Sequence, residues 1–186
     1  MVPERYRAEF EKDSDWLSFG YHVGNPITDL NSITVNDISF DYQVTADELV
    51  RITGCQVAST LRLSYFHGSR EVIETLNKIG GINVLLTADD DRMSYYLTDE
   101  QNQYIDMNDQ MMDDLMTFVS TDYRLDKLSK AGCFYNFIKT AYDPKQNGIQ
   151  AVFTHEWLLD RNMFEKIELF YRLAKKYKYL FCLNIL

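Results

Sequence analysis

The chain is 186 residues long, and its 46% hydrophobic and 25% charged residues indicate one folded domain, 1–186, with a real hydrophobic core. Its formal net charge of −9 excludes nucleic acid and anionic membranes as expected main partners. No stretch approaches the roughly 18 apolar residues of a membrane span, and the first residues lack the apolar core of a signal peptide. We therefore expect a cytoplasmic protein, or a piece whose targeting segment is missing.

The first half of the sequence predicts alternating helices and strands. Thr45 and Glu48 form a capping box, which predicts a short helix that begins there and stops at Gly54. The other predicted segments are a polar, helix-permissive stretch at 3–13, strands at 16–22, 60–66 and 82–86, and a helix that starts at Ser69 and ends at Gly80-Gly81.

The second half continues the alternation after an interruption. Residues 88–114 are rich in Asp, Asn, Gln and Met and predict an irregular excursion with a possible hairpin. The segments predicted after it are strands at 116–120, 149–153 and 179–183, an amphipathic helix from 125 to before Pro144, and a long helix at 158–176. About six strands alternating with helices predict an α/β fold with mostly parallel strands, arranged as a partial or distorted (β/α) barrel.

Polar residues follow most of the predicted strands. In parallel α/β folds, ligands meet the carboxyl ends of the strands. All three histidines of the chain fall at such ends, which is the main argument from the residues for a site. The strand-end residues are His22, Tyr65-Phe66-His67, Thr87, Asp89-Asp90-Asp91-Arg92, Thr121-Asp122, Arg124 and Thr154-His155-Glu156-Trp157. The alternative is that they are ordinary polar loop residues, some of which cap helices.

Three strings resemble motifs of the polysaccharide deacetylase family, the NodB-homology domain. They are Asp15-Trp-Leu-Ser-Phe-Gly-Tyr-His22, Leu86-Thr-Ala-Asp-Asp-Asp-Arg92 and Phe153-Thr-His-Glu-Trp157. The resemblance covers most of the chain in order. It implies a distorted (β/α) barrel and a bound divalent metal, zinc above all, that activates water to hydrolyse acetyl groups from carbohydrate.

The resemblance also implies roles for individual residues. His22 matches a metal-ligand histidine, and His155 matches the late histidine that acts as general acid. Asp89 or Asp90 would orient the site or act as base. Arg62, Arg92 and Trp157 would hold the substrate.

The sequence departs from the family pattern at its beginning. The family's Asp-Asp motif would precede His22, and no such strand stands there, so the first strand–helix unit is expected to be missing. Ser18 occupies the place of the family's partner histidine. A different metal site, built from His22, His67 and His155 with an aspartate of the 89–91 loop, is one way to restore the chemistry.

Two further classes of function stay open. The chain is alternatively a non-catalytic carbohydrate-binding protein or domain fragment, in which the abundant aromatic residues line a cleft. A third class is an interaction module whose acidic excursion at 88–114 binds a protein partner. An incomplete barrel would leave strand edges and apolar surface uncovered, which favours a homodimer.

Overall fold

The computed structural model describes residues 6–23, 33–90, 92–121, 123–142, 151–154, 158–177 and 183–185. The helices in this part of the chain are α1 (Arg7–Lys12), α2 (Val35–Thr53), α3 (Arg70–Gly80), α4 (Asp99–Asn108), α5 (Lys130–Ala141) and α6 (Arg161–Tyr177). The strands are β1 (Leu17–Phe19), β2 (Thr60–Leu61), β3 (Val84–Leu86), β4 (Gln110–Met112), β5 (Thr117–Val119), β6 (Tyr123–Arg124), β7 (Val152–Phe153) and β8 (Leu183–Ile185). None of the described helices is long and apolar enough to cross a membrane.

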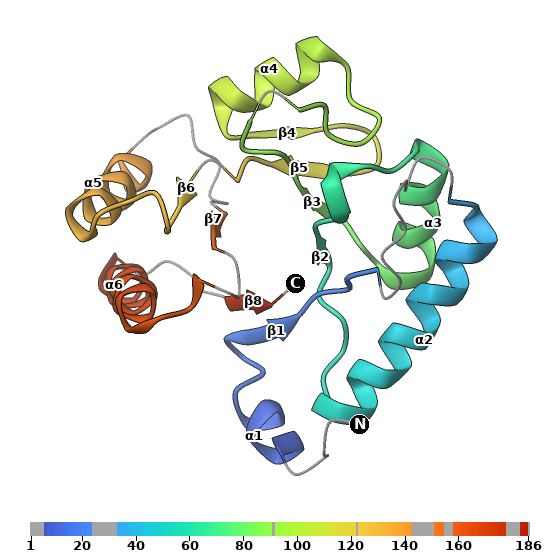
Figure 1. Ribbon diagram of the computed structural model, residues 1–186, viewed down its shortest axis with the longest axis horizontal. Coiled ribbons are helices and arrows are strands. Elements are labelled where there is room, and N and C mark those ends of the chain that lie inside the picture. Colours follow the sequence, from blue (N-terminus) through green and yellow to red (C-terminus); the bar gives the residue numbers. More distant parts are fainter. Residues whose placement is uncertain are drawn as a thin grey trace.

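The strands are short and mostly parallel. Four of them form a sheet in the order β2-β3-β5-β4, in which only β4 runs antiparallel to its neighbour. β1 pairs with β8, and β6 pairs with β7, both in parallel. Figure 1 shows the strands gathered around the middle of the molecule with helices on the outside. The fold is therefore mixed α/β with mostly parallel strands, and the described strands do not close into a barrel.

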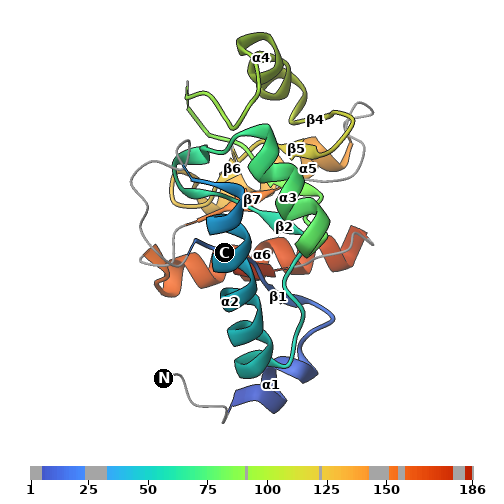
Figure 2. The same ribbon diagram turned by 90° about the vertical axis from the view of Figure 1, so that its right-hand side faces the viewer.

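Two separate hydrophobic clusters form the interior. The larger core lies between the four-stranded sheet and helices α2 and α3, which lie side by side (Figure 2). It includes Ile38 of α2, Ile73 of α3, Leu85 of β3 and Phe118 of β5, all fully buried. The smaller core joins α5 and α6 to Leu125, the residue after β6. The thiol of Cys133 is buried there.

Helix α2 begins eleven residues earlier than the sequence predicts. Its N-cap is Thr34, whose hydroxyl accepts a hydrogen bond from the backbone N–H of Asp37, so the prediction of a helix start at Thr45 is wrong. Both threonines have cap-like surroundings in the sequence. The burial of Ile38 and Tyr42 against the larger core stabilises the first turns and makes Thr34 the cap. The predicted end at Gly54 is confirmed, with φ of 72°.

The strand predicted at 60–66 ends after two residues. A 3₁₀ turn, Ser64–Phe66, replaces its second half because Tyr65 and Phe66 both have positive φ. The excursion at 88–114 contains the helix α4, which was not predicted. The antiparallel pair in this region joins β4, at the end of the excursion, to β5, the strand predicted separately at 116–120, so the hairpin does not lie within 88–114.

The remaining predicted elements are present with shifted ends. The helices predicted from Ser69 and at 158–176 correspond to α3 and α6. The helix predicted before Pro144 corresponds to α5. β8 lies just beyond most of the strand predicted at 179–183, whose residues 179–182 are outside the described part of the chain.

Candidate functional site

The carboxyl ends of β2, β3 and β5 lie at one edge of the sheet because these strands are parallel neighbours. Buried hydrogen bonds extend the pairing of β3 and β5 past the strand ends. The N–H of Thr87 donates to the carbonyl of Val119 at 2.9 Å, and the hydroxyl of Thr121 donates to the carbonyl of Thr87 at 2.6 Å. The loops that leave this edge therefore start from a rigid base.

Arg62 lies between two aromatic rings at this edge. Its guanidinium is 4.8 Å from the ring centroid of Phe66 and 5.0 Å from that of Phe153, the last residue of β7. Arg92, in the loop after β3, lies 5.2 Å from the Phe66 ring as well. Cation–π contacts thus connect β2, β7 and the β3 loop.

The turn after β2 has a strained backbone. Tyr65 and Phe66 have φ values of 56° and 59°, and Tyr95, beside them, has a φ of 57°. The N–H of Tyr95 donates to the carbonyl of Phe66 at 2.6 Å, and its hydroxyl donates to the carbonyl of Leu86 at 2.7 Å. Positive φ is unfavourable for bulky residues and persists only where surrounding contacts impose it. The result is that Phe66 is buried, while the Tyr65 side chain is directed to solvent and is 61% exposed.

Asp89 forms ion pairs that reach across the edge. Arg124 of β6 and Lys127 both donate to its carboxylate at 3.1 Å. Partial burial alone would raise the pKa of Asp89, but the hydrogen bonds from Arg124 and Lys127 outweigh it and hold the pKa below its ordinary value. Arg124 is also held by Asp126. Asp89 is therefore ionised at neutral pH, and two cations occupy its carboxylate.

Asp90 forms a more exposed pair within its own loop. The Nε of Arg92 donates to its two carboxylate oxygens at 2.7 and 2.9 Å. These hydrogen bonds lower the pKa of Asp90. Both side chains are about half exposed, at 49%. Unlike Asp89, Asp90 is open to a ligand.

We call the residues that meet at this edge the strand-end cluster. Its members are Arg62, Tyr65, Phe66, Asp89, Asp90, Arg92, Arg124 and Phe153.

The structure brings together four of the eight residues singled out from the sequence. Arg62 and Arg92 converge on Phe66, Asp90 pairs with Arg92, and Asp89 lies at the same edge. His155 and Trp157 lie outside the described residues, so their roles stay predictions.

The two described histidines are not members of the strand-end cluster. His67 follows the strained turn, and its ring centroid is 6.3 Å from that of Tyr65. His22 is exposed, with its Nδ1 3.2 Å from the carbonyl oxygen of Val23. Within the described ranges no group of three or more His, Cys, Asp or Glu is placed to hold a metal ion.

Sequence reasoning listed Tyr65 and Phe66 among the strand-end residues but gave them no role, and it left Phe153 out of that list. Phe66 and Phe153 are the last residues of predicted strands, and that position was a usable signal. The exposure of Tyr65 had no signal, because neither Tyr65 nor Phe66 is a residue type that prefers positive φ.

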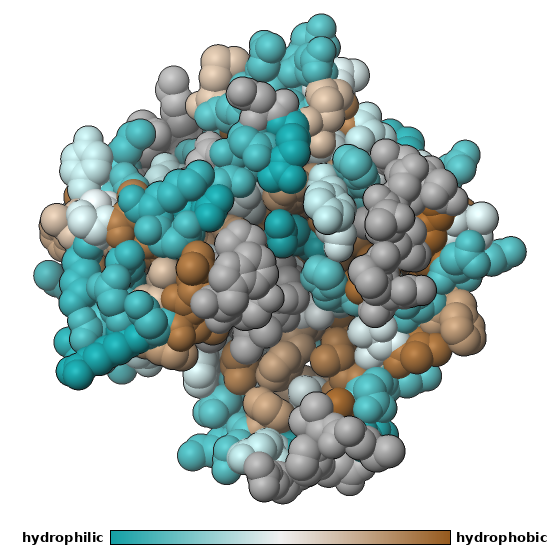
Figure 3. Space-filling view, viewed as in Figure 1, coloured by the Kyte–Doolittle hydropathy of each residue, from teal (hydrophilic) through white to brown (hydrophobic). Residues whose placement is uncertain are grey.

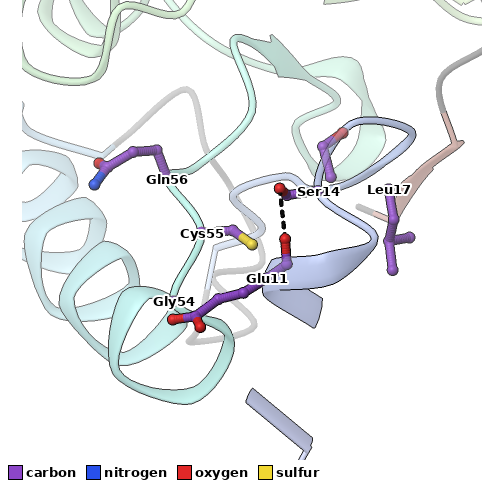
Figure 4. Close-up of a pocket in the computed structure, with 7 residues that line it drawn as sticks. Glu11, Ser14, Leu17, Gly54, Cys55 and Gln56 are labelled. Carbon is purple, nitrogen blue, oxygen red and sulfur yellow. Dashed lines mark hydrogen bonds between the residues drawn. The ribbon is translucent and has the colours of Figure 1, made fainter. Parts of the chain in front are cut away.

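A pocket of about 390 Å³ lies at the opposite edge of the strands. Figure 4 shows it between α1, the start of β1 and the end of α2. It is lined by Glu11, Ser14, Leu17, Ser18, Gly54, Cys55 and Gln56. The Ser14 hydroxyl donates to the carbonyl of Glu11 at 2.8 Å, and the Glu11 side chain lies against the bare Cα of Gly54. In parallel α/β folds the amino ends of strands serve stability more than chemistry, so the strand-end cluster is the better candidate site.

Comparisons of the chain with protein-family models, with curated proteins and with solved structures found no match. The likeness to polysaccharide deacetylases therefore rests on the three sequence motifs alone.

Proposed function

We propose that the chain binds an acetylated carbohydrate at the strand-end cluster. The observation that carries this proposal is Tyr65, a large aromatic side chain that a strained backbone directs into solvent at the carboxyl end of β2. Strain of this kind gathers at ligand sites, where function compensates for its cost. An exposed aromatic ring offers a flat apolar surface on which the C–H face of a sugar stacks, and a hydroxyl at its edge.

Polar groups near the Tyr65 turn suit the hydroxyl and acetyl groups of a saccharide. The half-exposed Asp90 carboxylate accepts hydrogen bonds, and the guanidinium of Arg92 donates them. Arg92 stacks on Phe66, the residue after Tyr65, which fixes its position relative to the turn. An aromatic surface with a few fixed polar groups is typical of small-ligand sites.

The proposal includes the distorted (β/α) barrel that the resemblance implies. Support comes from the parallel pairs β1–β8, β2–β3–β5 and β6–β7, which follow one another around the middle of the molecule with the helices outside (Figure 1). An isolated parallel bridge between Phe19 and Val57 adds a connection between β1 and the segment before β2. A homodimer and a cytoplasmic location stay predictions beside it.

Metal-dependent deacetylation is the second candidate function. Asp89 and Asp90 have lowered pKa values and are ionised, which is the state in which carboxylates bind divalent metals. The described residues do not fit a metal site, however, because Asp89 is occupied by Arg124 and Lys127 and no set of three ligands is present among them. We therefore derive no catalytic step through a metal, and the general-acid role of His155 stays a prediction from the resemblance.

Saccharide binding can be tested on an array of acetylated oligosaccharides, including N-acetylglucosamine oligomers and O-acetylated xylan fragments. We expect the wild type to bind, Tyr65→Ala to lose the signal and Tyr135→Ala to keep it, since Tyr135 is equally exposed but lies on α5. Tyr65→Gly should also lose binding while folding at least as stably as the wild type, because glycine accepts positive φ without strain. The proposal is contradicted if Tyr65→Ala binds as well as the wild type, or if the wild type does not bind.

Deacetylation is measured in the same preparations as acetate released with zinc present. If the wild type releases acetate and His155→Ala does not, deacetylation becomes better supported than simple binding. Saccharide binding without any release would leave the binding function alone.

A further inference from the structure

The negative charge of this protein is concentrated in one segment. From Met93 to Tyr123 the sequence contains no Lys, Arg or His and seven acidic residues, which account for most of the net charge of −9. The acidic residues are Asp99, Glu100, Asp106, Asp109, Asp113, Asp114 and Asp122. This segment includes helix α4 and the edge strand β4, which pack against each other at the margin of the four-stranded sheet (Figure 1).

Helix α4 exposes both apolar and acidic side chains to solvent. Ile105 is its only buried residue, so the helix attaches to the molecule by a narrow contact. Its opposite side carries Tyr104, 50% exposed, and Met107, 76% exposed. Among the exposed carboxylates, Glu100 lies on the same stripe as Tyr104 and Met107, at i, i+4 and i+7. Asp99 and Asp106 lie along the other margin of the solvent-facing half of the helix. We call these five residues the α4 face. Figure 3 shows the surface above α4 as mainly hydrophilic with interspersed apolar side chains.

The two kinds of side chain together select the kind of partner. Carboxylates without any neighbouring cation in sequence repel nucleic acid, anionic lipid and a second copy of the same face. Exposed methionine and tyrosine side chains bury well against an apolar surface, and methionine adapts its shape to it. We propose that the α4 face docks a lysine- or arginine-rich amphipathic helix of a partner protein, with the partner's apolar side chains on Tyr104 and Met107 and its cations on the carboxylates.

Neighbouring residues keep the face in place. Thr98 and Gln101 form a complete capping box at the start of α4. In the turn after β4, Asp113 accepts hydrogen bonds from the backbone N–H groups of Leu115 and Met116, and Asp114 pairs with Arg70 of α3. Those two carboxylates are held by structural contacts and are left in place in the variants below. The proposal does not depend on the strand-end cluster or on its ligand.

The test uses a labelled synthetic peptide of about 18 residues, made of Leu and Lys in helical periodicity, and fluorescence anisotropy in about 50 and 300 mM salt. We expect Tyr104→Gln/Met107→Gln to weaken binding about tenfold. Asp99→Asn/Glu100→Gln/Asp106→Asn should weaken it at low salt and flatten its salt dependence. Phe40→Gln, which removes an equally exposed apolar side chain from α2, should bind as the wild type does.

Four results would overturn the proposal. One is unchanged binding by Tyr104→Gln/Met107→Gln. Another is equally tight binding of a Lys-only peptide, which would mean unspecific charge attraction. The third is self-association of the wild type that the same double variant abolishes, which would make a second copy the occupant. On the unaltered protein, peptide-induced NMR shifts should be confined to residues 98–112, and shifts centred elsewhere would contradict the proposal.

Discussion

The larger and the smaller core differ in how completely they exclude solvent. In the larger core, side chains from three helices and three parallel strands cover one another, and many of them have no exposed surface. In the smaller core, α5 and α6 pack mainly on each other, and every buried residue except Cys133 keeps between 3% and 8% of its surface exposed. The smaller core also includes Lys166, a basic residue, among its buried side chains.

This difference indicates that stability is unevenly distributed along the chain. Local opening requires less free energy where fewer apolar contacts are broken. The two-residue strands β6 and β7 add little backbone pairing to the smaller core. The ion pairs of Asp89 with Arg124 and Lys127 connect the loop after β3 to the part of the chain that carries the smaller core. We therefore expect the α5–α6 region to exchange its amide hydrogens faster than the four-stranded sheet.

The largest effect is expected for Phe118→Ala in the larger core. Phe118 is fully buried in β5, and its ring meets those of Tyr95 and Tyr96 at centroid distances of 6.3 and 5.8 Å. Its removal should leave a cavity and lower the free energy of unfolding by about 4 kcal/mol, measured by urea titration. Phe40→Ala, at a 73% exposed position, is the control and should cost little. A small loss for Phe118→Ala would contradict the ranking of the two cores.

Phe170→Ala is the corresponding substitution in the smaller core. Phe170 lies on α6 with its ring centroid 6.0 Å from that of Phe137 and is 5% exposed. We expect a loss of about 3 kcal/mol, at the low end for phenylalanine, because nearby solvent and the α5–α6 contact can relax around the gap. Hydrogen exchange should speed up in α5 and α6 and stay unchanged in β3 and β5. Equal acceleration in both regions would show that they unfold as one unit.

The sequence predicts most of the fold where burial leaves a periodic pattern. α3 and α6 have one apolar side each and were located correctly. α4 was missed because Ile105 alone is buried, so no period exists to detect. The start of α2 was misplaced because the choice between Thr34 and Thr45 depends on tertiary contacts of Ile38.

The candidate site was predictable as a set of positions but not as a set of pairs. Asp89 and Arg92 follow a predicted strand, and the rule that loops at the carboxyl ends meet places them at the site. Arg62 lies inside the strand predicted at 60–66, and it reaches the site because β2 ends at Leu61. The partner of Asp89 is Arg124, which lies 35 residues away, so local sequence contains no sign of the ion pair. The exposure of Tyr65 depends on a backbone strain that only the surrounding hydrogen bonds impose.

Asp89→Asn tests the link to the smaller core and should have an intermediate effect. The substitution weakens a partly buried ion pair with Arg124 and an exposed one with Lys127, and we expect a loss of about 2 kcal/mol at neutral pH, mostly from the Arg124 pair. The pKa of Asp89 is lower in the folded than in the unfolded state. Its stabilising contribution is therefore complete above about pH 4 and is lost as the pH falls through the folded-state value.

The pH dependence gives the prediction its control. Urea titrations of wild type and Asp89→Asn should differ most near neutral pH and converge in acid. Asp90→Asn, which breaks an exposed pair within a single loop, should show a smaller difference at every pH. A constant difference between wild type and Asp89→Asn across the pH range would mean that the ion pairs do not stabilise the fold.

The smallest effect is expected for Lys166→Met in the smaller core. The ammonium of Lys166 donates to the carbonyl oxygen of Leu125 at 2.6 Å, and the side chain is 5% exposed. Methionine keeps the apolar stem and removes both the hydrogen bond and the cost of burying a charge, so the two changes should nearly cancel, within about 1 kcal/mol. Lys166→Ala also loses the stem and should destabilise more. If Lys166→Met lowers the free energy of unfolding as much as Phe170→Ala does, the prediction is wrong. The hydrogen bond from Lys166 to the carbonyl of Leu125, and not α5–α6 packing, is then the main contact that holds β6 to α6.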